Sequence, residues 1–149
     1  MDERSASSPR MAMDEAFLMS TQLSELMERG VKALGLTSLR ARMLHAILQL
    51  GPMRQRQISD VLGCSTQQVA AVLDVLSDRG LIERRPDPND RRAHLVTLTE
   101  TGGALADQLE SHRAAVAEWL LKDLPPEKLD AFMLVAQEIR RRAVAPPSM

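Results

Sequence analysis

The spacing of apolar residues predicts helices over the first third of the chain. Apolar side chains recur every three or four residues within residues 16–34, and Gly35 ends that pattern. A second helix is predicted over residues 38–50, because Thr37 can cap its first turn and the Gly51-Pro52 pair stops it.

Two shorter helices follow, separated by a tight turn. The first is predicted over residues 54–62, and Gly63 can supply a left-handed turn after it. Ser65 can then cap a helix over residues 66–78, which Gly80 ends. The side chains expected to face inward from these two helices are Ile58, Val61, Leu62, Val69, Val72, Leu73 and Leu76.

After Gly80 the pattern changes from a helical period to short alternating runs. Residues 81–85 and 93–98 are predicted strands. The intervening PDPNDRR is rich in turn formers and charge, and it is too long for a two-residue turn, so we expect an extended and mobile tip.

Two amphipathic helices complete the chain. Thr99 can cap a helix over residues 100–122, and a second one runs from the Leu124-Pro125-Pro126 break to about Ala143. Their expected apolar stripes contain Leu105, Leu109, Val116, Trp119 and Leu120 in the first helix and Leu129, Phe132, Met133, Ala136 and Ile139 in the second.

This order predicts a mainly α fold, a winged helix-turn-helix with a two-stranded wing. Residues 36–99 form the predicted DNA-binding region. Residues 13–35 and 100–143 form helices that need a partner for their apolar faces, and a second copy of the chain is the expected partner. Residues 1–12 are expected to be a disordered arm and residues 144–149 a disordered tail.

Charge is segregated along the 149-residue chain, whose net charge is only −1. Residues 36–99 carry a net charge of +3, while the segments before and after them carry −2 each. All basic residues of the middle segment are arginines, which suit forked phosphate contacts and narrow minor grooves. An arginine-rich genome explains the arginine preference but not the segregation.

The second helix of the tight pair has the character of a recognition helix. Ser65, Thr66, Gln67 and Gln68 stand at its start, where such helices meet base edges in the major groove. Glutamine can bond adenine in a bidentate manner, and the helix N-terminus favours a phosphate.

The predicted wing supplies a second set of DNA contacts. Arg84, Arg85, Arg91 and Arg92 cluster around its base and tip, and Arg91 is placed to enter a minor groove. Asp90 is expected to hold Arg92 or a neighbouring arginine in a fixed pose.

Residues 51–102 resemble the MarR family (multiple antibiotic resistance regulators). The specific part is LSDRGLIERRPDPNDRRAHLVTLTETG, in which the turn, the strand and the wing-tip arginines match in order. The resemblance implies a homodimer on a palindromic operator, with recognition helices in major grooves and wings in minor grooves. It also implies repression of a neighbouring operon, relieved by a small, often phenolic, ligand. The alternatives are an activator of the same fold and a winged-helix module for protein contacts alone.

The chain departs from the family pattern at several positions. Arg54 replaces the usual Ser or Thr cap and is expected to reach a phosphate. Ala70 and Ala71 stand where Thr and Arg are common, which shifts base reading onto residues 66–68. Ala41 replaces a residue that is often a bulky aromatic near the family's ligand pocket. The residues assigned to such a pocket are Phe17, Ala41, Met43, His45 and His112.

Other chemistry has no motif in this sequence. Cys64 is the only cysteine, which suits a reducing cytoplasm, and an inert role is favoured over redox sensing. No nucleophile elbow, phosphate-binding loop or metal-ligand spacing occurs, so we expect no enzyme activity, cofactor or metal. No apolar run is long enough for a membrane helix, and no membrane partner is expected.

Overall fold

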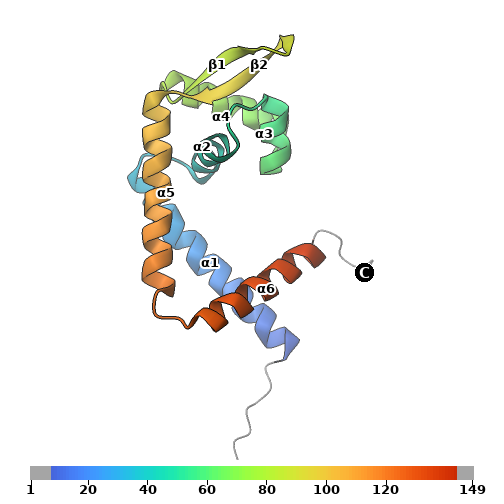
Figure 1. Ribbon diagram of the computed structural model, residues 1–149, viewed down its shortest axis with the longest axis vertical. Helices are drawn as coiled ribbons and strands as arrows, with labels where there is room; N and C mark the ends of the chain where they lie inside the picture. The colour runs from blue at the N-terminus through green and yellow to red at the C-terminus, as the bar shows by residue number, and fades with distance from the viewer. Residues whose placement is uncertain (1–7, 144–149) are drawn as a thin grey trace, which may run out of the picture. The chain divides into compact units, whose positions relative to one another are not determined.

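The computed structural model of this chain describes residues 8–143, whose helices and strands follow the predicted order (Figure 1). The elements are α1 (Pro9–Ala33), α2 (Ser38–Leu50), α3 (Gln55–Leu62), α4 (Thr66–Asp78), β1 (Ile82–Asp87), β2 (Asp90–Leu98), α5 (Glu100–Leu121) and α6 (Pro126–Ala143). Contacts divide the chain into one compact unit that ends at Arg113 and another that begins at Ala114. The winged-helix fold predicted from the sequence is confirmed, and it lies in the first unit.

Side-chain caps set the bounds of α2 and α4, which are those predicted. Thr37 Oγ1 accepts the backbone N–H of Arg40 at 3.4 Å, and Ser65 Oγ accepts that of Gln68 at 3.2 Å. Gly63 has a φ of +64°, so it reverses the chain after α3 in a conformation that other residues rarely adopt. These local signals are why the tight pair α3–α4 can be read from the sequence.

The first helix is longer than its apolar pattern predicts. It begins at Pro9, with Ser8 as a side-chain cap that accepts the backbone N–H of Met11 at 3.2 Å. The prediction of a disordered arm over residues 1–12 is therefore wrong for residues 9–12. A serine cap followed by proline can start a helix even where no apolar periodicity marks it. The rest of that arm and the expected tail over residues 144–149 lie outside the described residues.

The wing is also more regular than predicted. The two antiparallel strands continue to Asp87 and Asp90, so only Pro88 and Asn89 lie between them. The expectation of a hairpin too long for a two-residue turn was wrong, because an irregularity in pairing between Pro86 and Asp87 absorbs the extra residues.

A third, very short strand segment lies beside the hairpin. Met53 donates its backbone N–H to the carbonyl of Val96 at 3.1 Å, and Val96 donates back to Met53 at 2.8 Å. An isolated two-stranded hairpin is marginal in water, so this bridge matters for holding the wing to the segment between α2 and α3.

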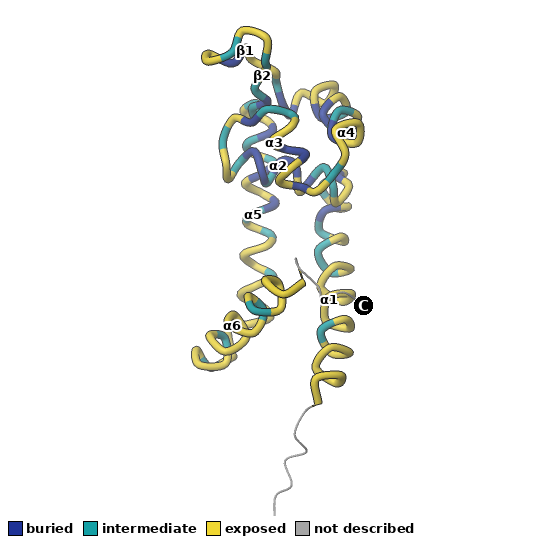
Figure 2. Tube along the Cα trace, turned by 90° about the vertical axis from the view of Figure 1, so that its right-hand side faces the viewer, coloured by how far each residue is buried: buried dark blue, intermediate teal, exposed yellow. Residues whose placement is uncertain are grey.

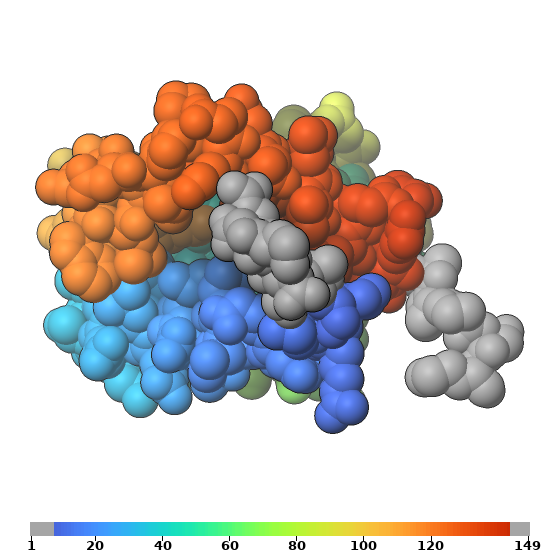
Figure 3. Space-filling model, turned by 90° about the horizontal axis from the view of Figure 1, so that it is seen from below, coloured from blue at the N-terminus to red at the C-terminus, as the bar shows by residue number. Residues whose placement is uncertain are grey.

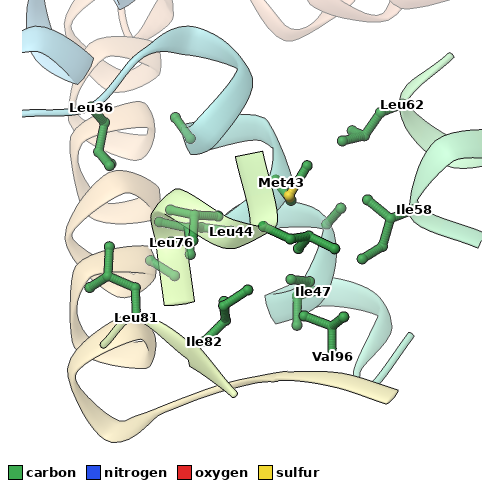
Figure 4. Close-up of a cluster of buried hydrophobic side chains, with 14 of the residues drawn as sticks. Leu36, Met43, Leu44, Ile47, Ile58, Leu62, Leu76, Leu81, Ile82 and Val96 are labelled. Atoms are coloured by element: carbon green, nitrogen blue, oxygen red, sulfur yellow. The ribbon is translucent and has the colours of Figure 1, made fainter. Parts of the chain in front are cut away.

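The hydrophobic core lies within the first unit and is centred on α2, α3 and α4. Figure 4 shows Met43 and Leu44 of α2 facing Ile58 of α3, with Leu76 and Ile82 closing the other side. Each of these residues is at most 3% exposed. Val61 was predicted to face this core, but it is 52% exposed, because α3 turns the face that contains Ile58, Ser59 and Leu62 to the core.

The start of α5 is pressed against the backbone that enters the wing. Thr99 donates its backbone N–H to the carbonyl of Leu81 at 3.1 Å, and its hydroxyl donates to the carbonyl of Gly80 at 2.6 Å. The same hydroxyl oxygen accepts the N–H of Gly102 at 3.0 Å. A Cβ on Gly102 would lie 1.8 Å from the Leu81 carbonyl oxygen, so only glycine fits at this position.

We therefore predict opposite effects of alanine at two neighbouring glycines of α5. Gly102→Ala should destabilise the fold by about 1–3 kcal/mol, because the clash is with backbone that cannot move aside. Gly103→Ala should leave stability unchanged or raise it by up to about 1 kcal/mol, because nothing lies within 4 Å of its added Cβ. Urea unfolding of both variants checks this, and equal stabilities would contradict the close packing.

The long helices are far less buried than the winged-helix region. Buried residues gather around α2, α3 and α4, whereas α1 and α6 are almost wholly exposed (Figure 2). The side of α1 seen in Figure 3 lies on the molecular surface over much of its length. In the second unit, α6 has no buried residue. Within residues 8–143, no helix combines the length and apolarity needed to cross a membrane.

Candidate nucleic-acid interface

The start of α4 is exposed, as a recognition helix requires. Ser65, Thr66, Gln67 and Gln68 all lie on the surface, while Val69 points into the core and is fully buried. The first turn of α4 is thus exposed to solvent, and Val69 anchors the helix in the core. Gln55 of α3 donates its side-chain N–H to the carbonyl of Thr66 at 3.1 Å, which ties the starts of the two helices together.

The two glutamines of this turn are in different situations. Gln68 Oε1 accepts the backbone N–H of Ser65 at 3.1 Å and its hydroxyl at 3.2 Å, while Ser65 Oγ caps the N–H of Gln68. This reciprocal capping box occupies the oxygen that a bidentate adenine contact would need. Gln67 makes no side-chain hydrogen bond among the described residues, so its amide is available.

The four wing arginines fall into two classes. Arg84 at the base of β1 donates to Asp74 of α4 at 2.7 Å, which joins the wing to the recognition helix. Arg85 pairs with Glu83 on its own strand. Both pairs are solvent-exposed and therefore worth little energy by themselves, so either arginine can exchange its carboxylate for a phosphate.

The second class contains the two arginines that follow the turn, which are not paired with an acid. Arg91 and Arg92 are exposed on β2 and form no ion pair with any described residue. The backbone N–H of Arg92 donates to Asp90 Oδ1 at 3.0 Å. Asp90 was expected to hold a neighbouring arginine, and it holds the backbone of Arg92 rather than its guanidinium.

Arg54 lies where the sequence predicts a helix cap, but its side chain turns to the wing. Its Nε and Nη2 donate to Asp87 Oδ2 at 2.8 and 2.6 Å, and its Nη1 lies 3.4 Å from Asp90 Oδ2. This arrangement differs from the expected phosphate contact, because two carboxylates already surround the guanidinium. Gln57 Oε1 accepts the backbone N–H of Arg54 at 2.8 Å, while the side chain at position 54 does not cap the first turn of α3.

Asp87 is a buried acid within this basic surface. The residue is 6% exposed, and its Oδ1 accepts the backbone N–H of Asn89 at 2.8 Å. That hydrogen bond, followed by the one from Arg54, lowers the pKa of Asp87 below its ordinary value. The carboxylate is therefore charged at neutral pH, and the stability it contributes would be lost only as the pH falls below about 4.

The residues assigned to a ligand pocket lie in dissimilar surroundings. Phe17 is 66% exposed on α1, whereas Met43 is fully buried in the core and Ala41 is buried beside it in α2. A pocket that includes Met43 would have to open the core of the winged-helix region.

Two histidines were assigned to the ligand pocket. His45 of α2 contacts α5, and His112 is a residue of α5. His45 of α2 places Nδ1 3.2 Å from Glu110 Oε2. His112 packs against α1 at Gly30, where an added Cβ would lie 2.0 Å from its Nε2. His112 Nε2 is buried without a hydrogen-bond partner among the described residues. These contacts give both histidines a packing role between helices of the first unit.

Cys64 is half-buried in the turn between α3 and α4. Its thiol lies 3.6 Å from the carbonyl of Leu62, and its own carbonyl accepts a hydrogen bond from the hydroxyl of Ser59. Among residues 8–143, no three His, Cys, Asp or Glu side chains gather as metal ligands would.

Sequence reasoning missed the acids that organise this surface. Asp87 was explained by turn formation alone, and Asp74 was given no role. The partner of Asp87 is 33 residues away, so no local pattern reveals the pair. The one available signal is the unusual arginine at position 54, in a place where a cap residue is expected.

Comparison with known proteins agrees with this geometry. Residues 34–93 match the family described as the MarR family. The matched residues include α2, α3, α4, β1 and the wing tip, so this winged-helix region resembles that family.

Solved MarR-family structures share the fold. A crystal structure of a MarR family transcription regulator has a TM-score of 0.81 at 22% identity, covering 89% of this chain and 87% of that one. A mutant MarR from E. coli complexed with operator DNA has a TM-score of 0.71 at 23% identity, with coverages of 87% and 94%. The S. aureus MepR–DNA complex has a TM-score of 0.69 at 20% identity, with coverages of 83% and 91%.

Proposed function

We propose that this chain is a DNA-binding transcription regulator of the MarR family. The observation that carries the proposal is the pairing of an exposed recognition-helix start, with Thr66 and Gln67 free, and a wing whose Arg91 and Arg92 have no acidic partner in the described chain. Two of the solved structures with this fold, from E. coli and S. aureus, are complexes with DNA. No site of enzymatic character competes with this assignment in residues 8–143.

The finer proposal is a repressor that binds a palindromic operator as a homodimer. The recognition helices would lie in major grooves about 10 base pairs apart, with the wings in the flanking minor grooves. Family resemblance supports repression of a nearby operon and release by a small ligand of the phenolic kind. We infer a cytoplasmic protein, because its target would be DNA.

Arg91 provides the direct test of the wing. Arg91→Ala should weaken binding to the protein's own promoter fragment by about 1–3 kcal/mol and reduce the salt dependence by about one ion, because an exposed arginine is lost from the phosphate or groove contact. Fluorescence anisotropy at several salt concentrations measures both quantities.

The control for Arg91 is Arg29→Ala, which removes the same charge from the exposed surface of α1. It should bind like the wild type. If Arg91→Ala binds the fragment as tightly as wild type, the wing assignment is wrong. If wild type fails to shift the fragment even at low salt, the chain is a protein-interaction module.

The two glutamines of α4 should separate base reading from helix capping. Gln67→Ala should change the preference at one operator position by about 1–3 kcal/mol without affecting stability, because its amide is free to bond a base. Gln68→Ala should lower stability by about 1 kcal/mol, because it removes half of the capping box.

Gln68→Glu is the matched control, since a glutamate can still accept the N–H of Ser65. Its stability should equal that of wild type. Binding to a set of operator variants, together with thermal unfolding, checks the division. A loss of base preference in Gln68→Ala but not in Gln67→Ala would contradict the assignment of base reading to Gln67 and of helix capping to Gln68.

Exposed apolar side chains on the long helices support the homodimer. Those exposed by more than half are Met11, Phe17 and Leu18 of α1, Trp119 of α5, and Met133, Leu134 and Val135 of α6. Large exposed apolar surfaces on a small chain usually mark an interface, and a second copy supplies the same surface by symmetry.

A charge on α6 should therefore break the dimer. Leu134 is 70% exposed, and Leu134→Asp should shift the mass measured by light scattering from about twice 16.5 kDa toward 16.5 kDa. Val61→Asp is the control, because Val61 is an exposed apolar residue of the winged-helix region and should stay dimeric. A wild-type chain with monomer mass would rule out the proposed dimer.

A further inference from the structure

One side chain connects the start of α3 to the tip of the wing. The guanidinium of Arg54 contacts Oδ2 of Asp87 through two nitrogens and Oδ2 of Asp90 through the third. These contacts join the residue before α3 to the ends of both strands. The side chain of Arg54 is 41% exposed, while that of Asp87 is 5% exposed, so the pair is shielded on the side of the acid.

The two acids share one arrangement. In Asp87, Oδ1 accepts the N–H of Asn89 and Oδ2 faces Arg54. In Asp90, Oδ1 accepts the N–H of Arg92 and Oδ2 faces Arg54. Each carboxylate therefore uses one oxygen to shape the turn and the other to bind the arginine. Charge-assisted hydrogen bonds of this kind are stronger than neutral ones and fix direction as well as distance.

The neighbouring residue anchors the wing at a second point. Met53 pairs with Val96 through two backbone hydrogen bonds, nearer the base of the hairpin. Consecutive residues thus hold the wing twice, Met53 by its backbone along the strand and Arg54 by its side chain at the tip. A hairpin held at both points has less freedom to swing relative to α3 and α4.

We propose that Arg54 is a positioning residue that fixes the wing tip for DNA binding through Asp87 and Asp90. This inference rests on the proposed DNA-binding function. The clamp places Arg91 and Arg92, which follow the turn directly, at a constant offset from the start of α4. A wing that is already ordered loses little conformational entropy when it binds DNA. Both the affinity and the selectivity for the operator are therefore higher.

The clamp also neutralises acids beside a surface that receives phosphate. Asp87 and Asp90 would repel DNA if their charge were uncompensated, and Asp87 is too buried to be screened well by solvent. Because its positive charge is already shared by two carboxylates, Arg54 acts on DNA through the wing rather than by a phosphate contact of its own.

The test is a double-mutant cycle in a charge-matched background. Arg54→Ala combined with Asp87→Asn removes one positive and one negative charge, so the net charge stays the same. This clamp-free variant should bind the operator fragment about tenfold more weakly than wild type. Adding Arg91→Ala should cost less than about threefold there, although it costs about fivefold or more in wild type, because a loose wing no longer positions Arg91.

Additive losses from Arg54 and Arg91 would overturn the proposal and indicate a direct phosphate contact by Arg54. Wild-type affinity in the clamp-free variant would overturn it as well. Arg56→Ala removes a charge from the exposed surface of α3 and serves as the control for charge loss. If Arg54→Ala alone weakens binding no more than Arg56→Ala does, its effect is one of charge near α3, and the clamp is refuted.

Amide hydrogen exchange provides a readout that does not need DNA. In the clamp-free variant, exchange should become faster at residues 87–92 while the amides of α4 keep their protection. Uniformly faster exchange would show a general loss of stability and would count against a positioning role. Arg54→Lys should lie between the two states, since an ammonium can bind one carboxylate but cannot fork to both.

The two hypotheses fail in different ways. If wild type does not bind DNA, the proposed function is wrong, whatever the exchange pattern at the wing. If wild type binds and the clamp-free variant binds equally well, the proposed function stands and only the positioning role of Arg54 is lost.

Discussion

The structure depends most on the junction where the hairpin closes onto the start of α5. At this point the chain leaves α4, makes the wing and returns, and both passages must meet within a few ångströms. Thr99 holds them together by hydrogen bonds to Gly80 and Leu81, and Gly102 lets the helix lie directly on the Leu81 carbonyl. Since Leu81 and Ile82 are buried beside this contact, the base of the wing is part of the hydrophobic core rather than an appendage.

The base of the wing is held by the core, but the tip of the wing is not and needs contacts of its own. A two-stranded hairpin buries little on its outer face, and no residue between Asp87 and Val96 belongs to the hydrophobic core. The chain supplies polar links there instead, from Arg54 to Asp87 and Asp90. Polar links suit a charged and solvated surface, because apolar packing there would cover the wing arginines.

The sequence predicts those parts of the fold that local chemistry decides. The starts of α2 and α4 follow from Thr37 and Ser65, whose caps are recognisable without any tertiary knowledge. The wing tip was misjudged, because the irregular pairing between Pro86 and Asp87 cannot be recognised from the local run of turn formers. Val61 was misjudged because apolar periodicity shows which face is apolar but not how much core is available to it. For the candidate site, residue types placed Thr66, Gln67 and Arg91 on the surface, whereas the capping role of Gln68 needed the atomic contacts.

The placement of acids among the wing arginines follows from the same constraint. A tip made only of arginines would repel itself and spread, since like charges close together in partly shielded surroundings raise the energy of the ordered state. Asp87 and Asp90 remove that strain and also satisfy the turn backbone, but each brings a negative charge close to where DNA would lie. Arg54 resolves the conflict from outside the hairpin, where its charge offsets the acids without adding to the crowding at the tip. Position 54 and position 87 are therefore linked. The arginine in place of the usual cap residue is paired with a wing carboxylate, and on the proposed DNA-binding surface it offsets the charge of that carboxylate.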